Sequence, residues 1–438
     1  MISAVQDYEA IKTAVKTAAD AHGEPDWFVQ RRLAAVDAMQ KLALPEVKRY
    51  DFHRWPLMDN MDLNFRKSDT SLANDLPQSK GQIRFVQVGQ TTVAVNVPTE
   101  LSKQGVILTD IFSAFRDYSE LTQKYFMTKV TKFNENKLTA YQQAFLNSGV
   151  FLYVPKGVEI KQPIEVYLIQ DSTVKQAMVS HVLIIADEGS QFSFIQHLNT
   201  KGETENAAHC MVEVMSQPDS HVHFSSVDEL GKNTYSFLHR RAYLSDDARF
   251  DWAVGIVNEQ NTLGDITSEL VGNGSHSESK VIAVTTGKQS NGINNRVVNI
   301  GKHTTANISQ RGVLLEKSEL IFNGIGNIIH GASGANAEQE NRVLMMSDQA
   351  HGDANPILLI DENDVIAGHA ASVGQVDENQ MYYLMSRGID KELAQRLVIR
   401  GFLGPVLEEI PLPEVRQEMI DVIERKIEDG QHFKQSNE

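Results

Sequence analysis

The stretch that decides the fold is NSGVFLYVPKGVEIKQPIEVYLI, residues 147–169. It consists of two apolar runs rich in β-forming residues, separated by the turn residues Pro155, Lys156 and Gly157. This order predicts a strand, a turn and a second strand. From here to about residue 360, short strand patterns alternate with small polar turns, and no long segment has helical periodicity.

The turns recur at a nearly constant interval. Turn sequences centred on Gly189, Asp219, Asp247, Gly274 and His303 follow one another about 28 residues apart. A repeat of strand pairs at a fixed period is typical of a solenoid, in which each coil buries its face against the next. A β-sandwich with strands every 8 to 12 residues or so is the alternative. The period persists over some 200 residues, too long a span for one sandwich, and this favours the solenoid.

Helical patterns flank the repeat. Residues 1–45 and Ile111–Tyr125 carry apolar residues at helical spacing, and a hairpin is expected around Ile83–Val97. After the repeat, Asp377 and Asp390 can each cap a helix. We therefore predict three regions. They are an N-terminal helical and mixed region (1–146), a solenoid core (147–376) and a C-terminal helical region (377–438).

The last predicted helix begins at Pro413 and carries one apolar stripe. Two placements are open for this stripe, against the other helices of the tail or against a partner protein. The stripe consists of Val415, Met419, Val422, Ile423 and Ile427.

Composition limits the possible partners and compartments. The 438 residues are 41% hydrophobic, which is typical of a globular protein, and no apolar run approaches the roughly 20 residues of a membrane-spanning helix. A formal net charge of -16, from 41 basic and 57 acidic residues, argues against a nucleic-acid or anionic-membrane partner. The first residues, MISAVQDYEAIKTAVK, have no signal-peptide core. We expect a cytoplasmic protein.

Catalytic and nucleotide motifs are missing from the sequence. It contains neither a GxSxG elbow with partner residues nor a GxxxxGK[ST] phosphate loop, so we expect no ATP site in this chain. His221 and His223 would place two imidazoles on one face of a strand, a geometry that can bind a metal. Because no third ligand stands near them in the sequence, surface histidines are the preferred interpretation. Cys210, the single cysteine, lies in an alternating apolar run and is expected to be a buried small residue.

A longer gapped motif follows the repeat. Gly-His-Ala-Ala-Ser-Val-Gly (368–374) is followed by Gln380, Tyr383, Leu384, Ser-Arg-Gly-Ile (386–389) and Gly401–Phe402. This pattern resembles the SufB/SufD family, the scaffold subunits of Suf iron–sulfur cluster assembly, and EPDWFVQRRLAAVDAMQKLALP (24–45) resembles the N-terminal region of that family. The resemblance implies a mainly β protein whose core is a right-handed parallel β-helix between N-terminal and C-terminal α-helical regions.

His369 is the candidate iron ligand. Small neighbours leave its imidazole uncrowded, and it comes after the apolar strands Ile357–Ile360 and Val365–Ile366, where the repeat ends. An open strand at the end of a solenoid invites pairing with a second chain. In SufD-like chains this histidine is the proposed interface ligand. SufB-like chains have an acidic residue after it and a cysteine upstream, where this chain has Ala370 and Ile360, so it is most like SufD.

The resemblance implies a non-catalytic scaffold subunit. It would pair with SufB through the last solenoid strands and share iron or a nascent cluster with SufB at His369, because one cysteine cannot supply the usual four thiolates. Its C-terminal helices would dock the SufC ATPase. The expected contact residues are Ile357, Leu359, Ile360 and Val365 toward SufB, and Tyr383, Leu384, Arg387 and Phe402 in the helices.

Two alternatives remain at this stage. A SufB-like scaffold could work as a homodimer, and self-association of the isolated chain is also possible. A β-helix that binds or cleaves polysaccharide is the other, although such enzymes need paired carboxylates or a calcium cluster, and neither is evident in the sequence.

Overall fold

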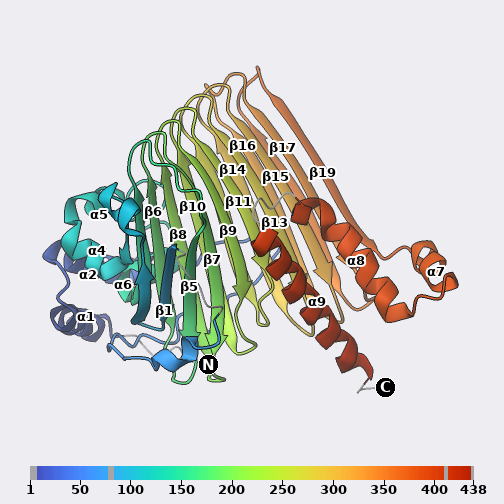
Figure 1. Ribbon diagram of the computed structural model, residues 1–438, viewed down its shortest axis with the longest axis horizontal. Helices are drawn as coiled ribbons and strands as arrows, with labels where there is room; N and C mark the ends of the chain where they lie inside the picture. Colours follow the sequence, from blue (N-terminus) through green and yellow to red (C-terminus); the bar gives the residue numbers. More distant parts are fainter. Residues whose placement is uncertain (1–6, 77–82, 409–412, 436–438) are drawn as a thin grey trace.

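Two long sheets form the centre of the computed structural model, which describes residues 7–76, 83–408 and 413–435 (Figure 1). One sheet has ten strands in the order β19-β17-β15-β13-β11-β9-β7-β5-β1-β2, and the other has nine in the order β18-β16-β14-β12-β10-β8-β6-β4-β3. The strands are β1 (Ile83–Val88), β2 (Thr91–Asn96), β3 (Ile107–Asp110), β4 (Ser148–Val154), β5 (Ile164–Asp171), β6 (Met178–Ala186), β7 (Gln191–Lys201), β8 (Asn206–Ser216), β9 (His221–Glu229), β10 (Thr234–Leu244), β11 (Arg249–Ile256), β12 (Thr262–Leu270), β13 (His276–Thr285), β14 (Ser290–Asn299), β15 (Thr305–Leu314), β16 (Glu319–Ile328), β17 (Asn336–Met345), β18 (His351–Ile360) and β19 (Ile366–Gln375).

From β4 onward the strands alternate between the sheets, so that each consecutive pair makes one coil of a parallel solenoid with about eight turns. The register pairs Arg249 with His276, an offset of 27 residues, and Glu319 with His351, an offset of 32. The predicted mainly β solenoid, with a period of about 28 residues, is therefore confirmed. Side chains from both sheets, among them Leu152, Val166 and Trp252, fill the space between them.

The predicted turn centres are the points where the chain adopts left-handed backbone angles. Asp219, Asp247 and His303 have φ values of 57°, 54° and 55°, and Gly189 and Gly274 have φ values of 66° and 69°. Each of these residues donates its backbone N–H to a carbonyl in the turn of the following coil. Short polar residues and glycine tolerate this conformation, which explains why they mark the repeat in the sequence.

Helices cover the N-terminal part of the nine-stranded sheet. Phe28, Phe115 and Phe126 pack against Phe151 and Leu183 on the outer face of that sheet. The predicted hairpin is confirmed, since β1 and β2 pair antiparallel while β1 also pairs in parallel with β5. The helical elements of this region are α1 (Tyr8–His22), α2 (Asp26–Lys41), the short 3-10 helix η1 (Thr70–Ala73), α3 (Thr99–Lys103), α4 (Ile111–Asp117), α5 (Ser119–Tyr125) and α6 (Lys137–Phe145).

The C-terminal tail folds back over the outer face of the ten-stranded sheet. Figure 1 shows α8 (Lys391–Glu408) and α9 (Pro413–Gln435) crossing this face, while α7 (Glu378–Ser386) stands beyond β19. The apolar stripe that begins at Val415 is buried against the sheet residues Ile195, Val227 and Ala253. The same cluster contains Leu403 and Val406 of α8, so the predicted placement against the tail's own helices is confirmed in part, and the packing on the solenoid was not predicted. No helix in the described ranges combines the length and apolarity needed to span a membrane.

Candidate functional site

The last coil leaves an open end. Among the strands that the structure describes, β18 pairs only with β16 and β19 only with β17, so each presents an unpaired edge. Ile360, Ile366 and Val373 are 42%, 64% and 42% exposed there, although Ile328 and Val343, the register partners of Ile360 and Val373, are buried. Unpaired strand edges beside exposed apolar side chains are typical of a surface that pairs with another chain. We call the surface formed by β18 and β19 the open end.

His369 lies inside β19, and the expectation that it follows the last strands is wrong in this respect. Its register partner is Gln339 on β17, and the same column continues through Ile308 and Ser279 to Trp252, all of which are buried. In-register parallel strands point paired side chains to the same face, so His369 occupies an inward-facing position. Because no coil follows β19, the imidazole is exposed where the next coil would stack. Beside it is a hollow of about 360 Å³.

The predicted contact residues toward SufB fall into two groups. Ile360 pairs with the buried Ile328, and Val365 packs against the small apolar cluster that contains Ile328, so both belong to the open end. Ile357 and Leu359 alternate with Ile360 and point to the outer face of the sheet. The predicted contact residues did not include Val373, which the period-two alternation of β19 places on the same face as His369 and could have identified.

The predicted contact residues in the tail also fall into two groups, one on α7 and one where α8 contacts the solenoid. On α7, Tyr383 is 57% exposed, and the guanidinium of Arg387 lies 4.8 Å from the centre of its ring. Leu384 lines a shallow hollow between α7 and α8 together with Tyr383. Phe402 instead ties α8 to the solenoid, because Arg311 on β15 donates to its carbonyl at 2.6 Å and stacks over its ring.

At the open end this chain offers an imidazole and no thiolate. Within the described ranges, His369 makes no hydrogen bond or ion pair, so its imidazole is free to bind a metal. Cys210 lies on β8 and is 1% exposed in the solenoid core, as predicted. Burial raises the pKa of the Cys210 thiol to about 11, which disfavours the thiolate that binds iron. Thiolate ligands at the open end would have to come from another chain.

The structure brings one residue to His221 and His223 that the sequence interpretation missed. Asp251 on β11 is in register with His223 on β9, and its carboxylate lies 3.0 Å from the ring of that histidine. The signal was present in the sequence, because Asp251 follows His223 by one period of 28 residues.

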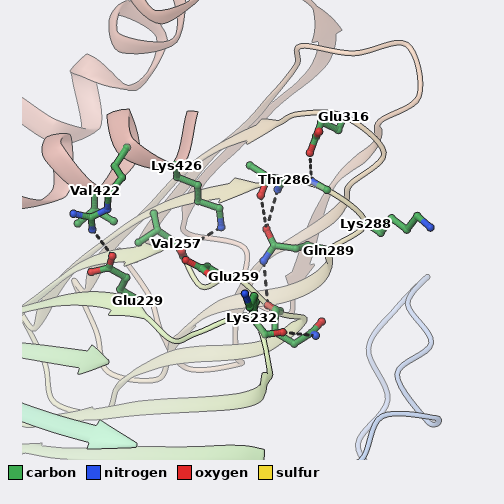
Figure 2. Close-up of a pocket in the computed structure, with 13 residues that line it drawn as sticks. Glu229, Lys232, Val257, Glu259, Thr286, Lys288, Gln289, Glu316, Val422 and Lys426 are labelled. Carbon is green, nitrogen blue, oxygen red and sulfur yellow. Dashed lines mark hydrogen bonds and ion pairs between the residues drawn. The ribbon is translucent and has the colours of Figure 1, made fainter. Parts of the chain in front are cut away.

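A cavity of about 430 Å³ lies along the junction between α9 and the solenoid. Figure 2 shows Lys426 extending from α9 toward Val257 and Glu259. The ammonium donates to the carbonyl of Val257 at 3.1 Å and also to that of Asn258. Burial lowers the pKa of Lys426 to about 7, although Glu259 and Glu229 oppose the shift.

Two family models together match most of the chain. The model described as "SUF system FeS cluster assembly, SufBD core domain" matches residues 167–402, and the model of the "SufBD protein N-terminal region" matches residues 6–166. This chain belongs to the SufB/SufD family. The SufD iron-sulfur cluster assembly protein of Bacillus subtilis is 39% identical over 94% of this chain and 97% of its own length. A SufBD family protein of Staphylococcus epidermidis is 25% identical over 92% of this chain and 90% of its own length. Membership of the SufB/SufD family favours the predicted scaffold role over the polysaccharide alternative.

Proposed function

We propose that this chain is a SufD-like, non-catalytic scaffold subunit of cytoplasmic iron–sulfur cluster assembly. The single observation that carries the proposal is the open end, where two unpaired strands expose apolar side chains around the imidazole of His369. The 39% identity to a SufD protein along nearly the whole chain supports the subunit type.

The proposed partner at the open end is SufB. Pairing of its last strands with β18 and β19 would continue both sheets and cover Ile360, Ile366 and Val373. Iron or a nascent cluster is then the cargo, with His369 as one ligand and the thiolates supplied by SufB. Neutral imidazole is a suitable ligand for iron, and this arrangement agrees with the buried state of Cys210.

The proposed docking surface for the SufC ATPase is formed by α7 and the adjoining face of α8. Tyr382, Tyr383 and Leu397 are 75%, 57% and 42% exposed on these helices. Phe402 lies behind this surface and links it to β15. Arg311 would therefore transmit a movement of the docked helices, caused by ATP binding to SufC, to the last coils of the solenoid.

The test is co-expression of this chain with SufB and SufC, followed by measurement of the mass of the purified complex. We expect a complex that contains one copy of this chain with SufB and SufC. A homodimer that ignores SufB would overturn the choice of subunit type.

The ligand role of His369 is tested in the same complex. His369→Ala should leave the complex intact and reduce the iron and sulfide that it retains after cluster assembly. His330→Ala is the matched control, because His330 is a surface histidine whose side chain is 91% exposed. Equal cluster content in the His369→Ala, control and unaltered complexes would exclude His369 as a ligand.

A further inference from the structure

A group of two histidines and one aspartate lies on the outer face of the ten-stranded sheet. His221 and His223 are two residues apart on β9, and their side chains therefore share one face of the strand. Asp251 stands beside His223 on the next coil. Among the described residues, this is the one group of three possible ligands whose donor atoms all lie within 4.8 Å of one another.

The distances are close to those that a metal ion requires. Asp251 Oδ2 lies 3.0 Å from His223 Nδ1 and 3.8 Å from His221 Nε2. Metal–ligand bonds of about 2.1 Å separate neighbouring ligand atoms by about 3 to 3.5 Å. Small side-chain rotations therefore suffice to bring three donors around one ion.

The surroundings hold the group in place while leaving it accessible. β9 and β11 each pair with strands on both sides, which fixes the backbone beneath all three ligands. The backbone N–H of Glu278 lies 3.3 Å from Asp251 Oδ1 and donates to it, so that Oδ2 faces the histidines. The side chains of His221, His223 and Asp251 are 35%, 30% and 23% exposed, which leaves room for water or another ligand on the ion.

The charge state of the group also suits a cation. Asp251 supplies a carboxylate that can balance the charge of a bound cation. His223 Nδ1 is enclosed and lies 3.0 Å from Asp251 Oδ2, so a metal ion bound to both atoms would take the place of a proton between them.

We propose that His221, His223 and Asp251 bind one divalent first-row transition metal ion, and that Fe²⁺ is the ion this ligand set suits. Two histidines and one carboxylate on one side of an ion, with the other positions open, are typical of mononuclear Fe²⁺ sites. Zn²⁺ accepts the same donors and is the main competitor. The site goes beyond the proposed role of the open end and does not depend on it. Four strand spacings separate β11 from β19, about 19 Å at ~4.8 Å per spacing, so His369 cannot complete it.

The experiment uses the full-length chain without a histidine tag, freed of metal by chelation. Co²⁺ is titrated as a spectroscopic probe, and Fe²⁺ binding is then measured by anaerobic equilibrium dialysis. We expect one ion of either metal per chain. His223→Ala and Asp251→Asn should each weaken binding at least about tenfold.

The matched control is His276→Ala, and His369→Ala is measured beside it to detect metal bound at the open end. His276 lies on the same face one coil further along, 3.2 Å from its own partner Glu278, and is not one of the three ligands. His276→Ala should keep the affinity of the unaltered chain. Asp251→Asn preserves the shape of the side chain, and the melting temperature without metal shows whether each variant folds. Added metal should raise the melting temperature of the unaltered chain and of His276→Ala, but not that of the His223→Ala and Asp251→Asn variants.

Three results would overturn the proposal. The first is an unaltered chain that binds neither Co²⁺ nor Fe²⁺, and the second is equal binding by a folded His221→Ala/His223→Ala double variant. The third is loss of binding in His369→Ala alone, which would show that the metal binds at the open end. None of these results bears on pairing with SufB, which is measured separately, so the two proposals can fail independently.

Discussion

The two ends of the solenoid are built in opposite ways. At the N-terminal end, β1 continues one sheet and β3 continues the other. Val97 and Leu101 pack against the core between the two sheets. We call this the capped end. The capped end finishes in the antiparallel strands β2 and β3, which cannot continue the parallel stack. At the open end, β18 and β19 finish in parallel register, and no further strand of the described chain pairs with either of them.

The difference shows where this chain is self-sufficient and where it is prepared for a partner. A solenoid needs a cap at each end to protect its core and to block edge-to-edge association. Here the chain provides its own cap at one end and leaves inward-facing residues such as His369 and Val373 exposed at the other. The open end is thus the part of the core whose completion is left to another molecule.

The largest expected effect compares one core residue at each end. Leu152→Ala should lower the free energy of unfolding by about 2–5 kcal/mol, because Leu152 is 0% exposed in the first coil. Ile360→Ala should cost less than about 1 kcal/mol, since Ile360 is already 42% exposed. Urea unfolding followed by circular dichroism measures both. Equal losses would mean that the open end is as tightly packed as the capped end.

Two strand glycines give a second matched pair. A Cβ at Gly149 on β4 would lie 2.1 Å from the carbonyl oxygen of His181, whereas a Cβ at Gly368 on β19 would meet nothing within 4 Å. Gly149→Ala should therefore cost about 3 kcal/mol through backbone displacement. Gly368→Ala should leave the melting temperature unchanged. If Gly368→Ala destabilises the isolated chain as strongly, the last coil is not open as described.

The third comparison concerns the tail that leaves the open end and returns along the sheet, and the change in stability that it predicts for one pH unit is the smallest of the three. The pKa of Lys426 is about 7 in the folded protein, against an ordinary value of 10.5. Between pH 7 and 10 the unfolded chain binds more protons at this residue, so stability should rise with pH by up to about 1.4 kcal/mol per unit. Well below pH 7, Lys426 is protonated in both the folded and the unfolded chain, and its contribution to stability no longer changes with pH.

Lys426→Met should reduce this slope while keeping the bulk of the side chain. Denaturant unfolding at several pH values compares the variant with the unaltered chain. Leu152→Ala serves as the control, because a change at the capped end should shift every value without altering the slope. Identical slopes in the Lys426→Met variant and the unaltered chain would show that the tail is not held through a buried Lys426.

The sequence by itself determined the repeat. Strand alternation and turn residues every 28 or so positions predicted the solenoid, because left-handed turns select glycine and short polar residues. Helix boundaries were predicted for the same local reason. Asp377 and Asp390 cap α7 and α8 by accepting backbone N–H groups, at 2.8 Å in both cases.

Only the tertiary structure decided which distant residues meet. Coil register placed Asp251 beside His223 and turned His369 inward, while the packing of the tail on the sheet buried the stripe around Val422. These outcomes depend on contacts between residues far apart in the chain. A local pattern specifies that a side chain must be buried, but the stacking of the coils determines what it is buried against.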